Sequence, residues 1–175
     1  MEQVVLLAAD GSPTGSAPKR SVHTHDTPLH LAFSCYLFDP DGRLLLTRRA
    51  LSKATWPGVW TNSFCGHPGP GENLSAALHR RVRQELGVAL SDLRLALPDF
   101  RYRAVDANGI VENEICPVYT AVVGDDQLLS PDPDEVAEWE WVRPDDLAES
   151  VTRTPFAFSP WLVLQLPRLL AQRGT

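Results

Sequence analysis

Five side chains of this 175-residue chain form a candidate set of ligands for a divalent metal ion. Glu112 and Glu114 are two positions apart, so on a strand they point to the same face. The histidines are His23, His30 and His67, and the first two are separated by six residues in a polar segment. Imidazole and carboxylate ligands together suit Zn²⁺, Mn²⁺ or Mg²⁺. Spacing alone favours ordinary polar surface residues, so the metal hypothesis depends on the surrounding motifs.

A second candidate is an acid–base pair made by Cys65 and Glu114. A thiol and a carboxylate on opposite faces of a substrate could donate a proton on one side and accept one on the other. The alternatives are a buried structural thiol, which is the commoner environment of cysteine, and an exposed strand carboxylate in an ion pair. Neither alternative explains why Cys65 lies just ahead of the clearest helix of the chain.

The basic residues are unevenly used, with 14 arginines and only two lysines. Both lysines fall in a group that could bind phosphate, because guanidinium forks and ammonium groups both bind phosphate oxygens. Arg48 and Arg80 are expected to be solvated charges instead, since strand alternation and helical spacing turn them away from their neighbours. The phosphate-binding candidates are Lys19, Arg49, Lys53 and Arg81.

Trp161 ends an aromatic segment and could stabilise a cation through its ring face without acting as a nucleophile. Trp56 and Tyr102 could line the same pocket. Core packing is the alternative for each of these rings, and it is the better interpretation for Phe156 and Phe158.

Runs of apolar and β-branched residues predict the strands. A hairpin is expected on the Asp-Pro-Asp-Gly turn at residues 39–42, and the polar segment at residues 12–29 is expected to be a loop. The predicted strands lie at residues 4–9, 31–38, 43–49, 59–65, 94–103, 110–123 and 135–142.

The clearest helix is predicted at residues 74–86. Asn73 can cap its N-terminus, and Gly87 can end it in a left-handed conformation. Arg81 and Glu85 lie on one ridge beside the apolar stripe, which suits a face that looks into a site.

Two more helices are expected at residues 145–149 and 160–172, and Pro167 can kink the second. Strands interspersed with a few helices indicate an α/β or α+β fold, a mixed β-sheet sandwich flanked by α-helices. The length fits a single domain, residues 1–175.

The composition narrows the class of protein. A net charge of −6 and a pI near 5.3 do not favour binding to nucleic acid or to acidic membranes. No apolar run reaches transmembrane length, and no signal peptide is apparent. Cys35, Cys65 and Cys116 are odd in number and lack Cys-x-x-Cys spacing, which argues against a disulfide framework and a zinc ribbon. We therefore expect a reduced, cytoplasmic protein and, by default, a monomer.

The segment at residues 66–88 resembles the diphosphate- and metal-binding helix of Nudix proteins, whose pattern is Gx5Ex7REUxEExGU. Arg81 and Gln84 stand where that family has glutamates. Nudix hydrolases use these glutamates to gather Mg²⁺ ions and cleave a diphosphate. The resemblance therefore implies a fold that binds a diphosphate but is poorly equipped to hydrolyse it. The matching positions are Gly66, Glu72, Arg80, Val82, Glu85, Gly87 and Val88.

Nearly the whole chain is also similar to type I isopentenyl diphosphate isomerases, non-hydrolytic members of the Nudix superfamily. The family's reaction is a reversible 1,3-proton shift between isopentenyl and dimethylallyl diphosphate, through a tertiary carbocation. The resemblance implies a Nudix-like sandwich and a small prenyl diphosphate as substrate. It rests on segments that include Thr47-Arg48-Arg49-Ala50-Leu51-Ser52-Lys53, Trp56-Pro57-Gly58-Val59-Trp60-Thr61-Asn62-Ser63, Cys65-Gly66-His67-Pro68, Gly109-Ile110-Val111-Glu112-Asn113-Glu114 and Phe158-Ser159-Pro160-Trp161.

The resemblance also implies roles. Cys65 and Glu114 are the proton-transfer groups, and which of them donates stays open. Tyr102 hydrogen-bonds Glu114, and Trp161 stabilises the cation and seals the pocket. Glu85 holds a Mg²⁺ that arrives with the diphosphate. A further divalent metal, Mn²⁺, Mg²⁺ or Zn²⁺, is held by His23, His30, His67, Glu112 and Glu114. The diphosphate is neutralised by Lys19, Arg49, Lys53 and Arg81.

Three other functions fit parts of the pattern. A Nudix hydrolase of a prenyl or nucleoside diphosphate would need the glutamates that Arg81 and Gln84 replace. A non-catalytic diphosphate-binding module would not need Cys65, Glu114 and Trp161 together. A structural metal-binding protein would leave the cationic residues unexplained. The isomerase hypothesis gives every candidate residue a role.

Overall fold

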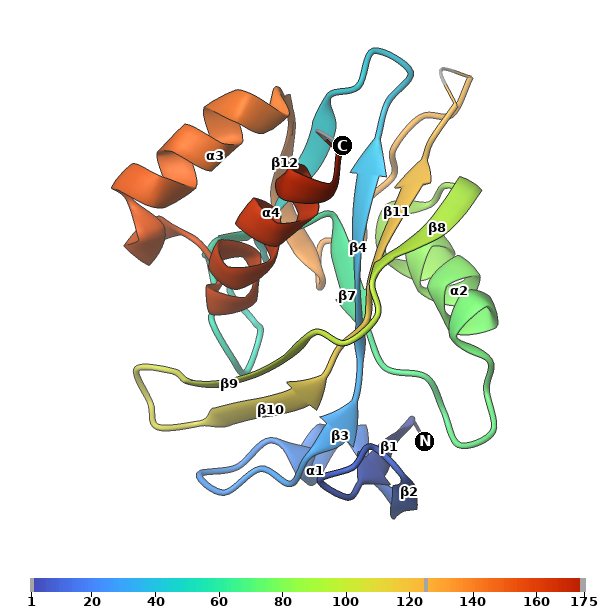
Figure 1. Cartoon of the computed structure of the whole chain (residues 1–175), viewed down its shortest axis with the longest axis vertical. Coiled ribbons are helices and arrows are strands. Elements are labelled where there is room, and N and C mark those ends of the chain that lie inside the picture. Colours follow the sequence, from blue (N-terminus) through green and yellow to red (C-terminus); the bar gives the residue numbers. More distant parts are fainter. Residues whose placement is uncertain (1, 125, 174–175) are drawn as a thin grey trace.

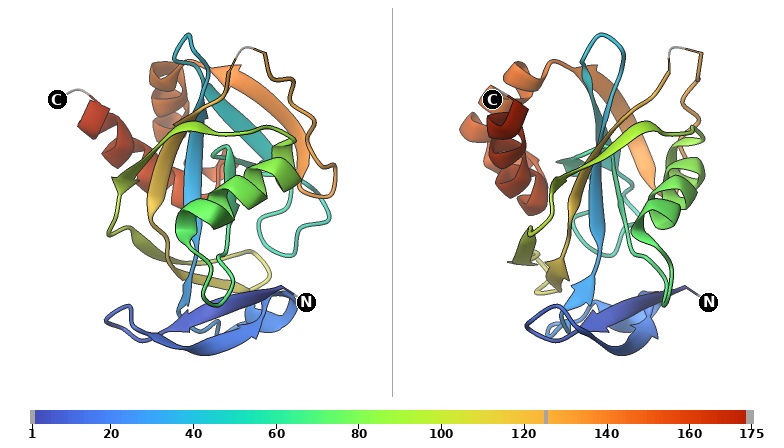
Figure 2. Two further views of the ribbon diagram at one scale, coloured as in Figure 1. Left: turned by 90° about the vertical axis from the view of Figure 1, so that its right-hand side faces the viewer. Right: turned by 45° about the vertical axis from the view of Figure 1, so that its right-hand side comes forward.

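The computed structural model describes residues 2–124 and 126–173, with the side chain of Arg173 excepted. Strand β4 (Phe33–Phe38) runs through the centre of the molecule (Figure 1). Helix α2 (Leu74–Leu86) covers one side of it, and helices α3 (Pro144–Arg153) and α4 (Pro160–Arg173) cover the other (Figure 2). The expected mixed sandwich with flanking helices is therefore confirmed. Within the described residues, no helix is long and apolar enough to cross a membrane.

The larger sheet has seven strands, in the order β12-β5-β4-β11-β8 with two short strands added beside this path. Strand β6 pairs with β5, and β7 pairs with β4. The bounds not yet given are β5 (Leu44–Arg49), β6 (Trp60–Thr61), β7 (Phe64–Gly66), β8 (Ser91–Leu97), β11 (Val118–Val122) and β12 (Val136–Val142).

The smaller sheet has five strands in the order β2-β1-β3-β10-β9 and lies below the larger sheet in Figure 1. Helix α1 (Lys19–Val22) follows β2, and the 3₁₀ helix η1 (Pro155–Ala157) separates α3 from α4. The strand bounds are β1 (Gln3–Leu7), β2 (Pro13–Pro18), β3 (His30–Leu31), β9 (Arg101–Val105) and β10 (Val111–Ile115).

Two chain segments pass side by side from the smaller sheet into the larger one. Strands β3 and β10 pair in parallel, with Glu114 opposite His30, and β4 and β11 continue the parallel pairing, with Val118 opposite Ser34. The Ala32 amide donates to the Ile115 carbonyl at 2.9 Å, so the ladder continues across the junction. The expected single strands 31–38 and 110–123 are therefore each divided between two sheets.

Other element boundaries differ from the prediction for local reasons. The expected strand 94–103 is two strands, β8 and β9, joined by a turn, and 59–65 is divided into β6 and β7. The segment expected to be a loop contains β2, which tolerates its prolines because it is an edge strand. Helix α3 is longer than expected, and α4 continues through Pro167.

Helix α2 has the predicted bounds because its ends are encoded locally. The Asn73 side chain accepts a hydrogen bond from the Ser75 amide, and Gly87 adopts a left-handed φ of 72° while its amide donates to Arg83. On the apolar face of the helix, Leu78 and Val82 are fully buried.

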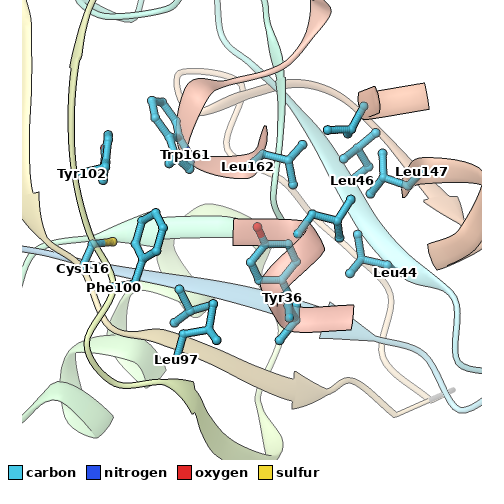
Figure 3. Packing of buried hydrophobic residues seen from close by; sticks show 14 of the residues in the cluster. Tyr36, Leu44, Leu46, Leu97, Phe100, Tyr102, Cys116, Leu147, Trp161 and Leu162 are labelled. Carbon is cyan, nitrogen blue, oxygen red and sulfur yellow. The ribbon is translucent and has the colours of Figure 1, made fainter. Parts of the chain in front are cut away.

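Every residue of β4 is buried, and successive side chains enter two different cores. Phe33, Cys35 and Leu37 pack with α2, whereas Tyr36 and Phe38 pack with α3 and α4. The second of these cores extends to Trp161 and Tyr102, which lie at one end of the packed cluster in Figure 3. Close packing of this kind fixes the walls on which the candidate site is built.

Candidate active site

A cavity of about 770 Å³ is lined by residues from both sheets and from α2. All the residues that the sequence assigned to the site line this cavity except His30, which is fully buried against Glu114. The fold therefore brings together positions that lie far apart in the chain. The lining residues of that set are Lys19, His23, Arg49, Lys53, Cys65, His67, Arg81, Glu85, Tyr102, Glu112, Glu114 and Trp161.

Three histidine rings and two carboxylates converge at the cavity. The ring centroids of His23, His30 and His67 are 5.2 to 5.9 Å apart. Glu114 Oε1 lies 3.4 Å from His30 Nε2 and 3.1 Å from His67 Nε2, because β10 and β3 pair at this position. Glu112 Oε2 lies 3.0 Å from His23 Nε2. Donor atoms of the three histidines and Glu114 all lie within 4.8 Å of one another.

The donor atoms of this cluster fit a divalent metal ion. His23 Nε2, His30 Nε2 and Glu112 Oε2 are buried and have no partner in good hydrogen-bond geometry among the described residues. His30 Nδ1 lies 2.9 Å from the Pro28 carbonyl, which can only accept, so in the neutral ring Nε2 presents a lone pair to the cluster. Thr55 donates to the other oxygen of Glu112 at 2.8 Å. Oriented imidazole and carboxylate donors of this kind are usual metal ligands.

The electrostatics of the cluster favour an ionised Glu114 and a neutral His67, which are the forms that bind metals. Burial acts to raise the pKa of Glu114, but His30 and His67 outweigh it and hold this pKa well below its ordinary value. Burial lowers the pKa of His67, although Glu114 opposes the shift. For His30 burial also acts to lower the pKa, but Glu114 dominates and the pKa is raised. Glu114 is thus an ionised, buried carboxylate, and its interpretation as an exposed surface residue is wrong.

Cys65 lies in β7, opposite Ser34 of β4. Its Sγ donates to Asn62 Oδ1 at 3.3 Å and lies 3.4 Å from Ser34 Oγ. Burial raises the pKa of the thiol to about 12, although both hydrogen bonds act to lower it. The thiol is therefore protonated at neutral pH and held in one orientation at the cavity wall. Cys35 and Cys116, in contrast, are core residues.

Trp161 is buried at the start of α4, and its ring contacts several neighbours. The centroid of its ring lies 5.7 Å from that of Trp56 and 5.9 Å from that of Tyr102. The guanidinium carbon of Arg49 lies 5.2 Å from the Trp161 ring centroid, so the ring face already contacts a cation. Trp56 packs behind Trp161 and is not among the described residues that line the cavity.

The contacts of Tyr102 and the exposure of Phe156 differ from the sequence-based predictions. Tyr102 lies directly opposite Glu114 in the β9–β10 ladder, but no hydrogen bond joins their side chains among the described residues. Phe156 is 85% exposed, so its assignment to the core is wrong. The turn η1 places this position on its outer side, whereas Phe158 packs against the core.

Two of the candidate phosphate-binding cations share a carboxylate that sequence reasoning missed. Glu135 pairs with Lys53 and lies 3.4 Å from Arg81, which also pairs with Glu85. Burial raises the pKa of Glu85, although Arg81 acts to lower it. The sequence predicts Glu135 only as the first residue of the strand at 135–142, directly after an acidic, Pro-rich segment, so only the tertiary structure reveals that it faces the cavity.

The other two cations are also held in place. Lys19 pairs with Glu2 at 2.8 Å. The Arg49 guanidinium donates to the carbonyl oxygens of Thr55 and Trp56 at 2.9 to 3.2 Å. The cavity is thus lined with positive groups, of which Lys19 and Lys53 each pair with one carboxylate, Arg81 contacts two, and Arg49 contacts neutral carbonyls. Cations of this kind can bind an anionic ligand.

The glutamate that begins the Nudix-like segment does not face this cavity. Glu72 forms a bidentate ion pair with Arg80, with two contacts of 2.8 Å, in a separate hollow beside it. Arg80 also donates to the His67 carbonyl at 3.2 Å, so its prediction as a merely solvated charge is wrong. The pair closes the loop ahead of α2 and leaves Glu85 as the carboxylate of this helix that lines the main cavity.

Comparison with known structures defines the class of the fold. The family model described as NUDIX domain matches residues 28–162. The crystal structure of a Deinococcus radiodurans protein covers 96% of this chain, and the chain covers 99% of that protein, with a TM-score of 0.74 and 20% sequence identity. The chain therefore has the fold of a Nudix protein.

Curated relatives define the branch within this class. The isopentenyl-diphosphate Delta-isomerase of Leifsonia xyli subsp. xyli is 65% identical over 175 residues, which covers 99% of this chain and 94% of that protein. The isopentenyl-diphosphate Delta-isomerase of Clavibacter sepedonicus is 61% identical over 173 residues, which covers 99% of this chain and 90% of that protein. The chain belongs to the isopentenyl-diphosphate Delta-isomerase family of Nudix proteins.

Proposed function

We propose that the protein interconverts isopentenyl diphosphate and dimethylallyl diphosphate by a reversible 1,3-proton shift. The observation that carries this proposal is one cavity in which Cys65, Glu114 and Trp161 lie together with the cations Lys53 and Arg81. The close relatives that bear the name of this activity support the same conclusion.

The reaction needs two proton-transfer groups and no net change of atoms. One group adds a proton to the double bond and gives a tertiary carbocation, and the other removes a proton from the carbon on the opposite side of the cationic centre. Cys65 and Glu114 suit these tasks, because a thiol and a carboxylate both exchange protons and both line the cavity. Since the reaction is reversible, each group donates in one direction and accepts in the other.

The carbocation must be stabilised without being captured by water. The ring face of Trp161 supplies negative potential and carries no nucleophile. Tyr102 packs beside it, and both side chains are buried, so the two rings would shield a cation in this part of the cavity from water. Burial raises the pKa of Tyr102 well above its ordinary value, and Glu114 adds to the shift, so its hydroxyl stays protonated.

The diphosphate would be bound by charge. Lys53 and Arg81 would exchange their contacts with Glu135 for phosphate oxygens, and Lys19 and Arg49 would complete the set. Mg²⁺ held by Glu85 would neutralise the diphosphate. The His/Glu cluster would hold a second divalent ion, namely Mn²⁺, Mg²⁺ or Zn²⁺.

Hydrolysis of the diphosphate is not favoured. Two glutamates of the Nudix pattern are replaced by Arg81 and Gln84, and Glu72 is occupied by Arg80. Arg81 contributes a positive charge beside Glu85 where a hydrolase would gather metal ions.

The test is proton NMR of isopentenyl diphosphate incubated with the protein and Mg²⁺ in D₂O, with phosphate release followed in parallel. We expect deuterated dimethylallyl diphosphate and no released phosphate. Released phosphate without isomerisation would return the protein to the hydrolases and refute the roles given to Cys65 and Trp161.

The Cys65→Ala variant tests the role of the thiol. We expect turnover to fall by about 10²- to 10⁴-fold, the usual contribution of a proton-transfer group, while binding of inorganic diphosphate is kept. Cys35→Ala is the control, because Cys35 is a buried thiol of the other core and does not line the cavity. Near-normal turnover of the Cys65 variant would remove this residue from the chemistry.

A further inference from the structure

Asn62 lies in the turn between β6 and β7, and its side chain is completely buried. Its amide nitrogen donates to the backbone carbonyls of Cys35 at 3.0 Å and Phe64 at 2.8 Å. Because these carbonyls can only accept, the orientation of the amide is fixed and Oδ1 points away from them. Neither the sequence patterns nor the proposed reaction has so far given this residue a role.

The Asn62 Oδ1 atom receives hydrogen bonds from two candidate catalytic side chains. Trp161 Nε1 donates to it at 2.9 Å, and Cys65 Sγ donates to it at 3.3 Å. Thr61 Oγ1 donates to the same atom at 3.0 Å. The indole N–H can only donate, so this contact requires the acceptor side of the amide. A single atom therefore connects the thiol of β7 to the indole of α4.

We propose that Asn62 is a positioning residue, which holds the Cys65 thiol and the Trp161 indole in a fixed relation to each other. The inference rests on the proposed function. The hydrocarbon end of a prenyl diphosphate has no polar group that could orient it, so the protein must supply the geometry. One side chain must reach a carbon with a proton while the other faces the developing cation, and a misplacement of about 1 Å can cost roughly 100-fold in rate.

The remaining contacts of the two side chains constrain them less. Ser34 Oγ also lies 3.4 Å from Cys65 Sγ, but this hydroxyl is shared with Cys116 at the same distance and with Gln165 at 3.0 Å. Trp161 is packed against other rings, and packing restricts the ring plane without defining a polar direction. The amide of Asn62 is itself anchored to two backbone carbonyls, which makes it the stiffer support.

The test compares Asn62→Ala with Ser63→Ala. Ser63 is the next residue, is equally buried, and makes two hydrogen bonds of 2.7 Å to the backbone of Leu45 and Leu37 without contacting either catalytic candidate. We expect Asn62→Ala to lower kcat by about 100-fold with KM changed by less than about threefold, since only the transition-state geometry is lost. Ser63→Ala is expected to keep kcat within about threefold.

A second measurement reports on the hydrogen bond of the Trp161 indole and does not depend on enzymatic turnover. The five tryptophans give separate indole N–H signals in ¹⁵N NMR spectra, and Trp161→Phe identifies the signal of Trp161. Asn62→Ala should speed the exchange of this indole proton with water by at least about tenfold, whereas Ser63→Ala should not. If Asn62→Ala does not fold, Asn62→Ser removes the amide oxygen with a smaller loss of volume, so fast exchange is again expected there, and exchange as slow as in the wild type would overturn the proposal.

The failures of the two proposals are distinguishable. A wild-type protein that does not isomerise the substrate refutes the proposed function. A wild-type protein that does isomerise it, together with equal kinetics and equal indole exchange in the Asn62→Ala and Ser63→Ala variants, refutes only the positioning role.

Discussion

Metal binding at the His/Glu cluster is expected to stabilise the fold measurably. In the metal-free protein His23 Nε2, His30 Nε2 and Glu112 Oε2 are buried without good hydrogen-bond partners. A poorly satisfied buried polar atom costs about 1–3 kcal/mol, and the close contacts of His23 with Glu112 and of His30 with Glu114 offset part of this cost, so a bound cation can relieve on the order of 3 kcal/mol. Binding of an ion at a free concentration of 100 times Kd stabilises the folded state by about 2.7 kcal/mol, which is of this size.

The magnitude converts into a melting temperature. For a domain of this size a change of 1 kcal/mol shifts Tm by about 2–4 °C, so saturation with Mn²⁺ or Zn²⁺ should raise Tm by about 5–11 °C. The assay is differential scanning calorimetry of EDTA-treated protein with and without added metal, with titration calorimetry to establish Kd.

Two variants test whether the metal-induced shift in Tm comes from the His/Glu cluster. His23→Ala removes a candidate ligand, so it should lose most of the metal-induced shift. The metal-free variant is the reference for that shift, because Glu112 also loses its neighbour at 3.0 Å. His79→Ala, in α2 and outside the cluster, should keep the full shift. The reasoning is refuted if neither metal binds the wild type, or if His23→Ala responds to metal as the wild type does.

Three further predictions concern single side chains of or near the cavity. Trp161→Phe should retain more turnover than Trp161→Leu, because the phenyl ring keeps a π face, and steady-state rates compare them. Glu135→Gln should tighten metal-free binding of inorganic diphosphate by about fivefold in titration calorimetry, because two cations lose a competing carboxylate. Glu72→Ala should lower unfolding free energy in urea by about 1 kcal/mol or less and leave turnover within about threefold, because its partner is Arg80.

Each of these has an outcome that contradicts it. Equal rates of the two Trp161 variants would make the ring a packing residue. Glu138→Gln is the control for Glu135, since Glu138 pairs with Arg48 outside the cavity, and equal affinities of the two variants would exclude charge competition. A large loss of turnover in Glu72→Ala would place that carboxylate in the catalytic machinery.

The elements that were predictable from sequence are those with local end signals. Helix α2 was predictable to the residue because Asn73 and Gly87 define its ends by their own conformations. The division of residues 31–38 into β3 and β4 was not, because the residues on either side of Ala32 are all strand-forming and only their neighbours decide which sheet they join. Strand β2 was missed for the opposite reason, since its prolines and glycine have loop character and are tolerated only at a sheet edge.

The residues of the candidate site also fall into those that the sequence could predict and those that it could not. The candidate residues that line the cavity were predictable because the resemblance to the isomerase family covers motifs that follow one another in the same order along the chain. The structure brings these residues together. Glu135 and Asn62 were not assigned a role, because an ion pair with Lys53 and a shared acceptor for Cys65 and Trp161 exist only once distant segments are packed. Phe156 was placed in the core on residue type alone, which cannot distinguish an inward from an outward position in a 3₁₀ turn.

Two adjacent chain segments pass together from the smaller sheet into the larger one, and this arrangement also determines how rigid the site is. His30 and Glu114 lie just before the crossing, and Ser34, which contacts Cys65, lies just after it. The distance from the His/Glu cluster to Ser34, which contacts the thiol, is therefore set by covalent backbone, at about 3.3 Å per strand residue. A hinge between the layers would have to break two adjacent strands at once. The interior thus behaves as a stiff frame, and any accommodation of a substrate falls to the rim segments that carry Lys19 and Lys53.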